Sequence, residues 1–222
     1  PEQAAEIYRK AGYDLIALTD HNSCRNCPAI LAAAQGTGLT VLPGMELCSA
    51  EEAHVVCLFP TLEAAQAFDD TVSPTLPPIP NRPEVFGEQL IMDGEDTIIG
   101  RLETLLVTAS ALSVDDIPAL ARQYGGTAFP AHIDRPSYSV TAALGDIPPV
   151  GFTAAEITAS GDTDALCQQY PLLSGLPLLQ NSDAHYLHQI AEAGPWLELP
   201  DKRPETVIAA LDGRLAFGWA RA

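Results

Sequence analysis

Histidines and carboxylates stand directly behind several short apolar segments of the sequence, where together they could bind a metal ion. Each of the apolar runs at 15–18, 41–44, 128–130 and 178–180 is followed closely by such residues, which are Asp20 and His21, then Glu46, then His132, and last Asp183 and His185. Imidazole nitrogens combined with carboxylate oxygens are ligands of zinc, manganese and iron rather than of calcium or magnesium alone. The pattern therefore predicts a transition-metal site.

Two further histidines, His54 and His188, do not follow a predicted strand. His54 opens the apolar run 55–59 instead of following one, so its side chain must reach the site from the start of a strand or from a bulge. His188 follows no predicted strand and lies on a polar turn, and we leave it out of the site. A single histidine is more often a hydrogen-bonded structural residue than a ligand, but the repetition of ligand types at several strand ends favours a metal cluster.

The segments that must position these side chains alternate between strand and helix. Strand-length apolar runs such as 15–18, 39–42 and 127–129 are separated by helical patterns such as 28–35 and 113–124. This alternation indicates right-handed βαβ units and a mostly parallel sheet. In a parallel α/β barrel, the carboxyl ends of the strands meet at one mouth, where active sites lie. We therefore expect an α/β chain with a closed or nearly closed barrel.

One segment interrupts the alternation. The prolines at positions 74, 77, 78 and 80 predict a loop, and the apolar stretches 89–92 and 97–99 flank the polar turn 93–96, which is typical of a β-hairpin. We interpret 69–108 as a loop and hairpin insertion on one domain that spans 1–222.

The charge balance bears on possible partners. The chain has 11 basic and 29 acidic residues, which gives a formal net charge of −18. Such a surface is expected to repel a polyanion, so we predict no duplex nucleic acid as a partner. A small phosphorylated substrate stays compatible, because bound divalent cations reverse the local field.

The cysteine content and the apolar pattern bear on location. The five cysteines are odd in number and scattered, so we expect free thiols, including the Cys24–Cys27 pair, rather than a disulfide framework or a structural zinc site. No apolar run has the roughly 18 residues of a membrane helix, and no export signal is visible. We expect a cytoplasmic protein without membrane contact.

Four motifs in order along the chain resemble those of the PHP (polymerase and histidinol phosphatase) superfamily of metal-dependent phosphoesterases. An aliphatic strand followed by Thr-Asp-His spans 15–23, and Gly-Met-Glu at 44–46 is followed by His54. Ala-His occurs at 131–132, and Ser-Asp-Ala-His at 182–185. The resemblance implies a distorted (βα)7 TIM-like barrel that hydrolyses phosphoesters.

The same resemblance implies a role for each residue in a site for up to three zinc, manganese or iron ions. Glu46 would bridge the first two ions, Asp183 would bind the first, and His54 and His132 would complete the second. His21 and His185 would bind the third, and Asp20 would orient a ligand from behind. We expect Glu46, His132 and Asp183 to be the catalytic residues.

One family motif is missing. A His-x-His on the first strand is expected upstream of Pro1, and no other His-x-His replaces it. We therefore expect this chain to lack the first barrel strand and to hold fewer than three ions. Arg135, three residues after His132, is a candidate phosphate clamp, since a guanidinium matches phosphate bidentately, and an ordinary surface arginine is the alternative.

Several functions stay open at this point. The favoured one is a phosphatase acting on a small molecule or a nucleotide, and a phosphodiesterase acting on short oligonucleotides belongs to the same class. A different hydrolase, an amidohydrolase-like enzyme that cleaves C–N bonds, usually relies on a bridging lysine, whereas Lys10 and Lys202 lie outside the strand ends. A non-catalytic domain with a relic metal site is the remaining alternative.

Overall fold

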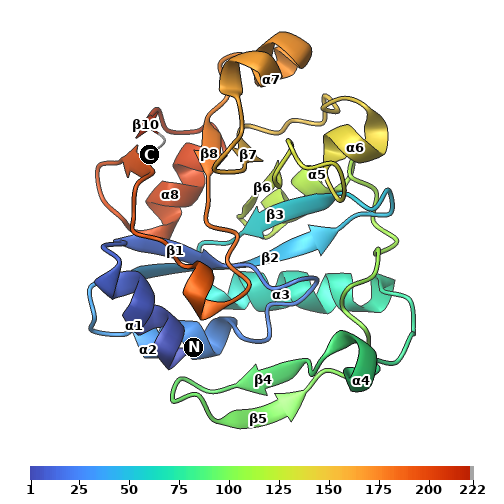
Figure 1. Cartoon of the computed structure of the whole chain (residues 1–222), viewed down its shortest axis with the longest axis vertical. Helices are drawn as coiled ribbons and strands as arrows, with labels where there is room; N and C mark the ends of the chain where they lie inside the picture. Colours follow the sequence, from blue (N-terminus) through green and yellow to red (C-terminus); the bar gives the residue numbers. More distant parts are fainter. Residues whose placement is uncertain (221–222) are drawn as a thin grey trace.

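The main sheet of the protein has four strands in the order β1-β2-β3-β6 (Figure 1), in a computed structural model that describes residues 1–220. These strands are β1 (Leu15–Leu18), β2 (Thr40–Cys48), β3 (His54–Leu58) and β6 (Thr127–Pro130). β1 runs parallel to β2, whereas β3 is antiparallel to both β2 and β6. The carboxyl ends of β1, β2 and β6 and the amino end of β3 therefore share one edge of the sheet.

Three two-stranded pairs accompany this sheet. The parallel pair is β7 (Ala155–Ile157) with β8 (Leu178–Gln180), and the antiparallel pairs are β4 (Leu90–Met92) with β5 (Ile98–Arg101) and β9 (Trp196–Glu198) with β10 (Gly218–Ala220). The α/β class is confirmed, but within residues 1–220 no sheet closes into a barrel.

The prediction of a mostly parallel sheet is wrong at β3. The connection between Cys48 and His54 is far shorter than the dozen or so residues that a parallel crossover requires. The chain instead turns back as a hairpin, in which Cys48 lies opposite His54.

Helices accompany the strands: those at 27–34, 62–72, 117–123 and 204–211 pack against the four-stranded sheet, and the short one at 83–86 lies beside the β4–β5 pair (Figure 1). The helices are α1 (Glu2–Lys10), α2 (Cys27–Ala34), α3 (Leu62–Val72), α4 (Pro83–Phe86), α5 (Ile117–Gln123), α6 (Val140–Leu144), α7 (Thr163–Gln169) and α8 (Pro204–Leu211), with short 3-10 turns at Ser73–Thr75, Pro171–Leu173 and Leu187–Gln189. Local capping fixes several starts: the Thr61 hydroxyl accepts a hydrogen bond from the Ala64 N–H at 3.2 Å at the start of α3. Within 1–220, no helix combines the length and the apolar character needed to cross a bilayer.

The two faces of the sheet bury separate apolar clusters, because successive side chains of a strand point to opposite sides. In β3, Val55 packs with Phe68 of α3 and Ile117 of α5, whereas Val56 packs with Ile208 of α8. A third cluster joins α1 and α2 to the strands next to them, through Ala5, Ile30 and Val41 among others. These layers support the strands on both faces of the sheet.

The predicted hairpin is present as β4 and β5, although α3 extends to Val72 and so makes the start of the predicted loop helical. Asn26, just before α2, ties the hairpin to the body of the protein: its Nδ2 donates to the Leu90 carbonyl at 3.0 Å and its Oδ1 accepts from the Met92 N–H at 2.9 Å. The assignment of 69–108 as an insertion on a single domain stays a prediction.

Candidate metal centre

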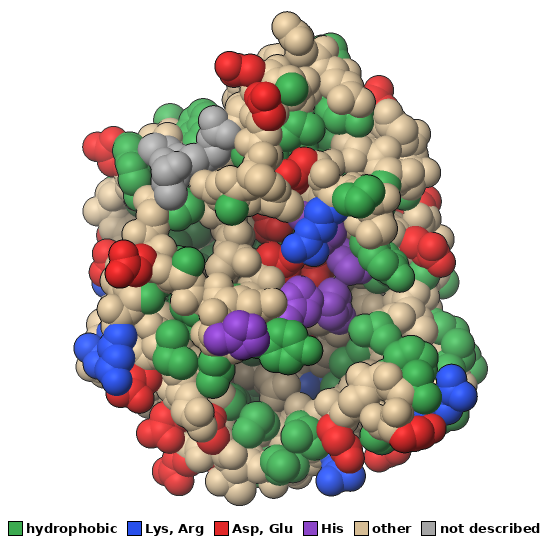
Figure 2. Space-filling view, in the orientation of Figure 1, with side chains coloured by type: hydrophobic (Ala, Val, Ile, Leu, Met, Phe, Trp, Pro, Cys, Tyr) green, Lys and Arg blue, Asp and Glu red, His purple; other side chains and the backbone are tan. Residues whose placement is uncertain are grey.

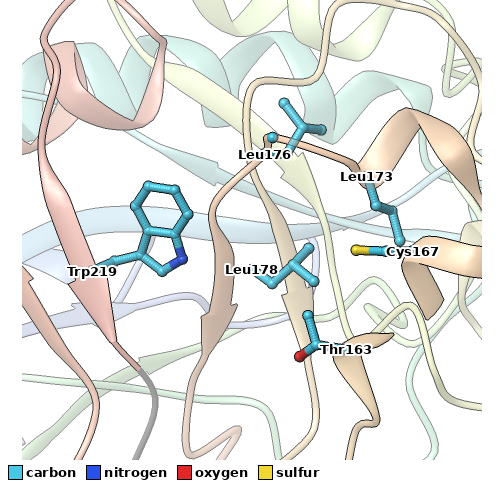
Figure 3. A pocket seen from close by; sticks show the side chains of 7 residues that line it. Thr163, Cys167, Leu173, Leu176, Leu178 and Trp219 are labelled. Atoms are coloured by element: carbon cyan, nitrogen blue, oxygen red, sulfur yellow. The ribbon is translucent and has the colours of Figure 1, made fainter. Parts of the chain in front are cut away.

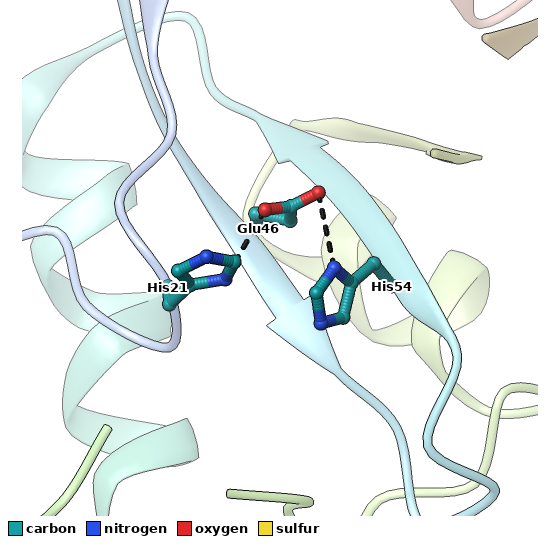
Figure 4. A group of neighbouring side chains, drawn as sticks. All are labelled: His21, Glu46 and His54. Carbon is teal, nitrogen blue, oxygen red and sulfur yellow. Dashed lines mark ion pairs between the residues drawn. The ribbon is translucent and has the colours of Figure 1, made fainter. Parts of the chain in front are cut away.

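Glu46 lies at the centre of three imidazole rings. Its carboxylate oxygens are 3.1 Å from His21 Nδ1, 3.3 Å from His54 Nδ1 and 3.2 Å from His132 Nε2. Figure 4 shows two of these rings, from His21 and His54, facing the carboxylate from opposite sides. One ligand atom from each of His21, Glu46 and His54 lies within 4.8 Å of the others, which is the spacing of groups around one ion.

The sheet explains this convergence. The parallel pairing of β1 and β2 continues past the end of β1 as a bridge between His21 and Glu46. On the other side of β2, the hairpin places His54 at the amino end of β3, and the antiparallel pairing of Val55 with Pro130 brings the end of β6, and thus His132, to the same edge. His54 therefore reaches the site from the start of its strand.

The charges of the cluster suit a cation. Burial alone would raise the pKa of Glu46, but hydrogen bonds from His132 and His54, together with the charges of His54 and His21, outweigh it and hold this pKa well below its ordinary range. Burial lowers the pKa of His21, which favours the neutral ring with a free lone pair. A carboxylate that stays ionised next to a neutral imidazole is a suitable pair of metal ligands.

His132 lies in the same buried cluster, but its ring holds a proton more readily than an ordinary histidine. Burial alone would lower its pKa, but the hydrogen bond and the charge of Glu46, with the charge of Glu156, raise it. The residue is 2% exposed, and its Nδ1 atom is buried without a hydrogen-bond partner among the described residues. Buried polar atoms are normally satisfied, so the unpaired Nδ1 atom is unusual. The donor set of imidazoles and a carboxylate around Glu46 fits a divalent transition metal, which would displace the proton of His132 on binding.

The remaining predicted residues, Asp183, His185 and Arg135, lie beside this cluster and contact one another. Asp183 forms an ion pair with Arg135, with Arg135 Nη2 at 2.5 Å from its Oδ2, and lies 3.7 Å from His185 Nδ1. The His185 ring is 5.7 Å from that of His21, between centroids. Figure 2 shows histidine, acidic and basic side chains gathered on this face. The predicted residues thus share one region.

Two further predictions concern Asp20, which is expected to orient a ligand, and His188, which is left out of the site. The Asp20 carboxylate accepts a hydrogen bond from Asn26 Nδ2 at 3.2 Å, and it is the backbone carbonyl of Asp20 that contacts Glu46, accepting from its N–H at 3.1 Å. His188 is exposed and stacks on Tyr186, with ring centroids 5.5 Å apart. The omission of His188 from the site agrees with this position.

The backbone around the cluster is unusual. Asn22, His132, Tyr138 and Asp183 all have positive φ angles, of 50°, 28°, 55° and 44°. Asn, Asp and His tolerate such conformations better than other residues, whereas at the bulky Tyr138 the cost is on the order of 1–3 kcal/mol. These conformations persist where surrounding contacts impose them. Asn22 shows how: its Nδ2 donates to the carbonyls of Leu106 and Thr108, at 2.7 and 2.8 Å. Strain of this kind is concentrated at functional sites.

Sequence reasoning missed Glu156, on β7. This carboxylate is 5% exposed; Oε1 accepts from the His132 N–H at 3.3 Å and Oε2 accepts from Asn181 Nδ2 at 2.7 Å. Burial raises its pKa to about 7, although the Asn181 hydrogen bond opposes this. Glu156 thereby joins the loops that carry His132 and Asp183. A lone carboxylate inside the apolar run 152–157 was the signal that could have revealed it.

A separate apolar cavity of about 430 Å³ lies beside α7 and β8 (Figure 3). Its lining includes Cys167, Leu178 and Trp219 and contains none of the candidate metal ligands. Because few polar groups converge on it, this cavity lacks the features of a catalytic site.

Comparison with known proteins adds information on the fold. The sequence matches no family model and no curated protein. Among solved structures, the lesion-specific endonuclease PfuEndoQ of Pyrococcus furiosus is similar, with a TM-score of 0.66, 19% identity, and coverage of 98% of this chain and 52% of that chain. A metal-dependent phosphoesterase of Bifidobacterium adolescentis, whose assignment is provisional, gives a TM-score of 0.55, 17% identity, and coverage of 84% of this chain and 82% of that chain.

A second endonuclease Q structure corrects one prediction. It holds a duplex substrate with an abasic lesion at the active site, and it is similar to this chain with a TM-score of 0.64, 18% identity, and coverage of 97% of this chain and 52% of that chain. The prediction that duplex nucleic acid is excluded is therefore wrong. A net charge is summed over the whole surface, whereas a phosphate group meets only the local field, which bound cations reverse. This chain spans about half the length of the endonuclease Q chains.

Proposed function

We propose that the protein is a metal-dependent hydrolase of phosphoesters. The observation that carries this proposal is the buried Glu46 carboxylate, which has His21, His54 and His132 within 3.3 Å of its oxygens. Buried carboxylates surrounded by imidazoles are typical of transition-metal sites.

Each residue of the region takes a role in this proposal. Glu46, His21, His54 and His132 hold zinc, manganese or iron, and Asp183 and His185 complete the ligands at the exposed side. A bound ion of this kind supplies Lewis acidity and lowers the pKa of water, which is the chemistry that phosphoester hydrolysis requires. Arg135, which is exposed next to Asp183, orients the phosphate, because its planar guanidinium donates two parallel hydrogen bonds. Glu156 holds His132 in place from behind.

Similar solved structures support a phosphoesterase. The Bifidobacterium protein is provisionally assigned as a metal-dependent phosphoesterase, and an endonuclease Q structure holds a duplex substrate with an abasic lesion, whose backbone is a phosphodiester. We infer that a small or nucleotide phosphoester is the first candidate substrate. Cleavage of a phosphodiester within a nucleic acid is the second candidate, because the similarity to endonuclease Q extends over 98% of this chain.

Two alternatives fit the site less well. A C–N hydrolase of the amidohydrolase type usually relies on a lysine among its metal ligands, whereas Lys10 pairs with Glu6 at 2.6 Å and Lys202 lies 3.4 Å from Asp14. A relic site without activity gives no reason for His21, His54 and His132 to converge on one buried carboxylate.

A substrate panel tests the proposal. Chelator-treated protein is loaded with zinc, manganese or iron(II) and assayed against 4-nitrophenyl phosphate, AMP, bis(4-nitrophenyl) phosphate and a DNA duplex with one abasic site. We expect hydrolysis of at least one of these phosphoesters, abolished by excess chelator and restored by metal. Turnover that survives excess chelator, or metal-loaded protein inactive on all of them, would overturn the proposal.

A further inference from the structure

An exposed tyrosine lies directly against the candidate metal centre. The Tyr138 ring stacks on the His54 ring, with centroids 4.9 Å apart and planes inclined by 22°. His54 in turn is 3.3 Å from Glu46 through its Nδ1 atom. Tyr138 is nevertheless 54% exposed. One face of its ring therefore covers a candidate metal ligand, and the other face is open at the rim of the site.

The backbone holds this ring in place at some cost. Tyr138 has a φ of 55°, which is unfavourable for a bulky side chain. Its carbonyl accepts a hydrogen bond from the His54 N–H at 2.8 Å, which ties the loop to the ligand's own strand. The next residue, Ser139, is fully buried and donates through Oγ to the Arg135 carbonyl at 2.7 Å. Hydrogen bonds thus hold the backbone that carries this exposed ring.

The open ring face suggests a ligand. An exposed aromatic face gains little for folding, and aromatic rings on rigid supports are the surfaces on which nucleobases stack. Arg135 precedes Tyr138 by three residues. Its guanidinium pairs with Asp183, and its exposed part has further N–H groups that can donate to a phosphate. A ligand with a phosphate at the metal centre and a flat ring attached to it would use both features.

We propose that the open face of Tyr138 binds the base of a nucleotide whose phosphate lies at the metal centre. This inference rests on the proposed function, since it places a phosphoester at that centre. It narrows the substrate class from phosphoesters in general to nucleotides. Tyr138 acts on specificity, through contact with the base, and takes no part in the chemical step.

Equilibrium binding tests the site without requiring turnover. The manganese-loaded full chain is titrated calorimetrically with the thiophosphate analogues of AMP and of ribose 5-phosphate. These are hydrolysed slowly, and they differ at C1′, where the first carries the base and the second a hydroxyl group. We compare Tyr138→Phe, which keeps the ring, with Tyr138→Asn, which lacks an aromatic ring but tolerates a positive φ. Tyr186→Asn is the matched control, because Tyr186 is 65% exposed and its ring stacks on His188 instead of His54.

We expect the wild type to bind the AMP analogue about tenfold more tightly than the ribose analogue, as one base–aromatic stack provides. The preference should persist in Tyr138→Phe and Tyr186→Asn and vanish in Tyr138→Asn. Equal affinities of the wild type for both analogues, or a preference that survives in Tyr138→Asn, would overturn this inference alone. Failure of the proposed function would instead show as the absence of metal-dependent hydrolysis in the substrate panel.

Discussion

His132 Nε2 lies 3.2 Å from Glu46 Oε1, while the Nδ1 atom of the same ring is buried and has no hydrogen-bond partner within the described residues. The backbone of the same residue is held by Glu156, whose carboxylate accepts a hydrogen bond from the His132 N–H. This arrangement connects the strand ends that form the candidate metal centre.

Removing this ring tests its role as a ligand. We expect His132→Ala to weaken manganese or zinc affinity at least about tenfold, because metal affinity depends on each positioned ligand. The metal-free variant should also lose about 1–3 kcal/mol of unfolding free energy, since the buried Glu46 carboxylate loses a partner. Competition with a coloured chelator measures the affinity, and urea unfolding measures the stability. His188→Ala, which removes an exposed histidine outside the cluster, serves as the control; equal affinities in the two variants would argue against His132 as a ligand.

The buried Glu156 carboxylate should make the unfolding free energy of the metal-free protein depend on pH. Its pKa is raised by burial from 4.5 to about 7. Between these values the folded chain keeps a proton that the unfolded chain has released, so stability falls as the pH rises through this window. At about 1.4 kcal/mol per pKa unit, the loss is about 3 kcal/mol. Glu156→Gln lacks this titration.

We therefore expect the unfolding free energy of Glu156→Gln, relative to the wild type, to increase between about pH 4.5 and 7. Urea unfolding of both proteins with chelator measures the difference, in which the titrations of the other groups largely cancel. Parallel stability curves across this range would show that Glu156 titrates at an ordinary pKa.

The proposed role of Arg135 in binding the phosphate predicts a change in KM when this residue is replaced. Arg135→Met should raise KM for the hydrolysed phosphoester about tenfold, because the phosphate loses a charge-assisted bidentate partner. Arg135→Lys should recover part of the loss, since a lysine keeps the charge but lacks the planar fork. Arg203→Met is the matched control, because Arg203 also pairs with an aspartate, Asp201, at 2.9 Å, on the exposed surface. An unchanged KM in Arg135→Met would show that Arg135 pairs with Asp183 but does not bind the phosphate.

The cysteines give a prediction about reactivity. All five are free, and Cys24 and Cys27 are each 1% exposed, with their thiols directed at the Gly44 carbonyl. Hydrogen bonding to Cys27 and burial raise the pKa of Cys24, which disfavours its reactive thiolate. We expect Ellman's reagent to modify the half-buried Cys167 first in native protein, and Cys167→Ser to react slowly until guanidinium is added. Rapid native modification of Cys167→Ser would contradict this burial.

Much of the candidate site followed from local patterns. Short apolar runs ending in His21, Glu46 and His132 suffice to predict a cluster, because strand ends meet at one edge whether the strands close into a barrel or not. The hairpin at β4 and β5 followed from the polar turn between its apolar strands. These features depend on residues close in sequence.

Features that depend on residues far apart in the sequence could not be predicted from local patterns. The pairing of β3 with β6, which lies far along the chain, is one such feature. The reversed direction of β3, by contrast, follows from the short connection after Cys48, which the expectation of regular βαβ units overlooked. Glu156 acquires its role through contacts to His132 and Asn181, which no local pattern contains. The pairing of Arg135 with Asp183 likewise arises only after β6 and β8 are placed side by side with β7.

The central claim is that Glu46 organises a metal centre that hydrolyses phosphoesters, and Glu46→Gln tests it most directly. Glutamine keeps the size of the side chain but removes the charge, and Glu84→Gln, at an exposed carboxylate on α4, is the matched control. Bound metal is measured by elemental analysis after dialysis, together with hydrolysis of the best substrate of the panel. We predict that the wild type and Glu84→Gln bind at least one equivalent of metal and turn over, while Glu46→Gln loses most of both. Wild-type metal content and wild-type turnover in Glu46→Gln would contradict the claim.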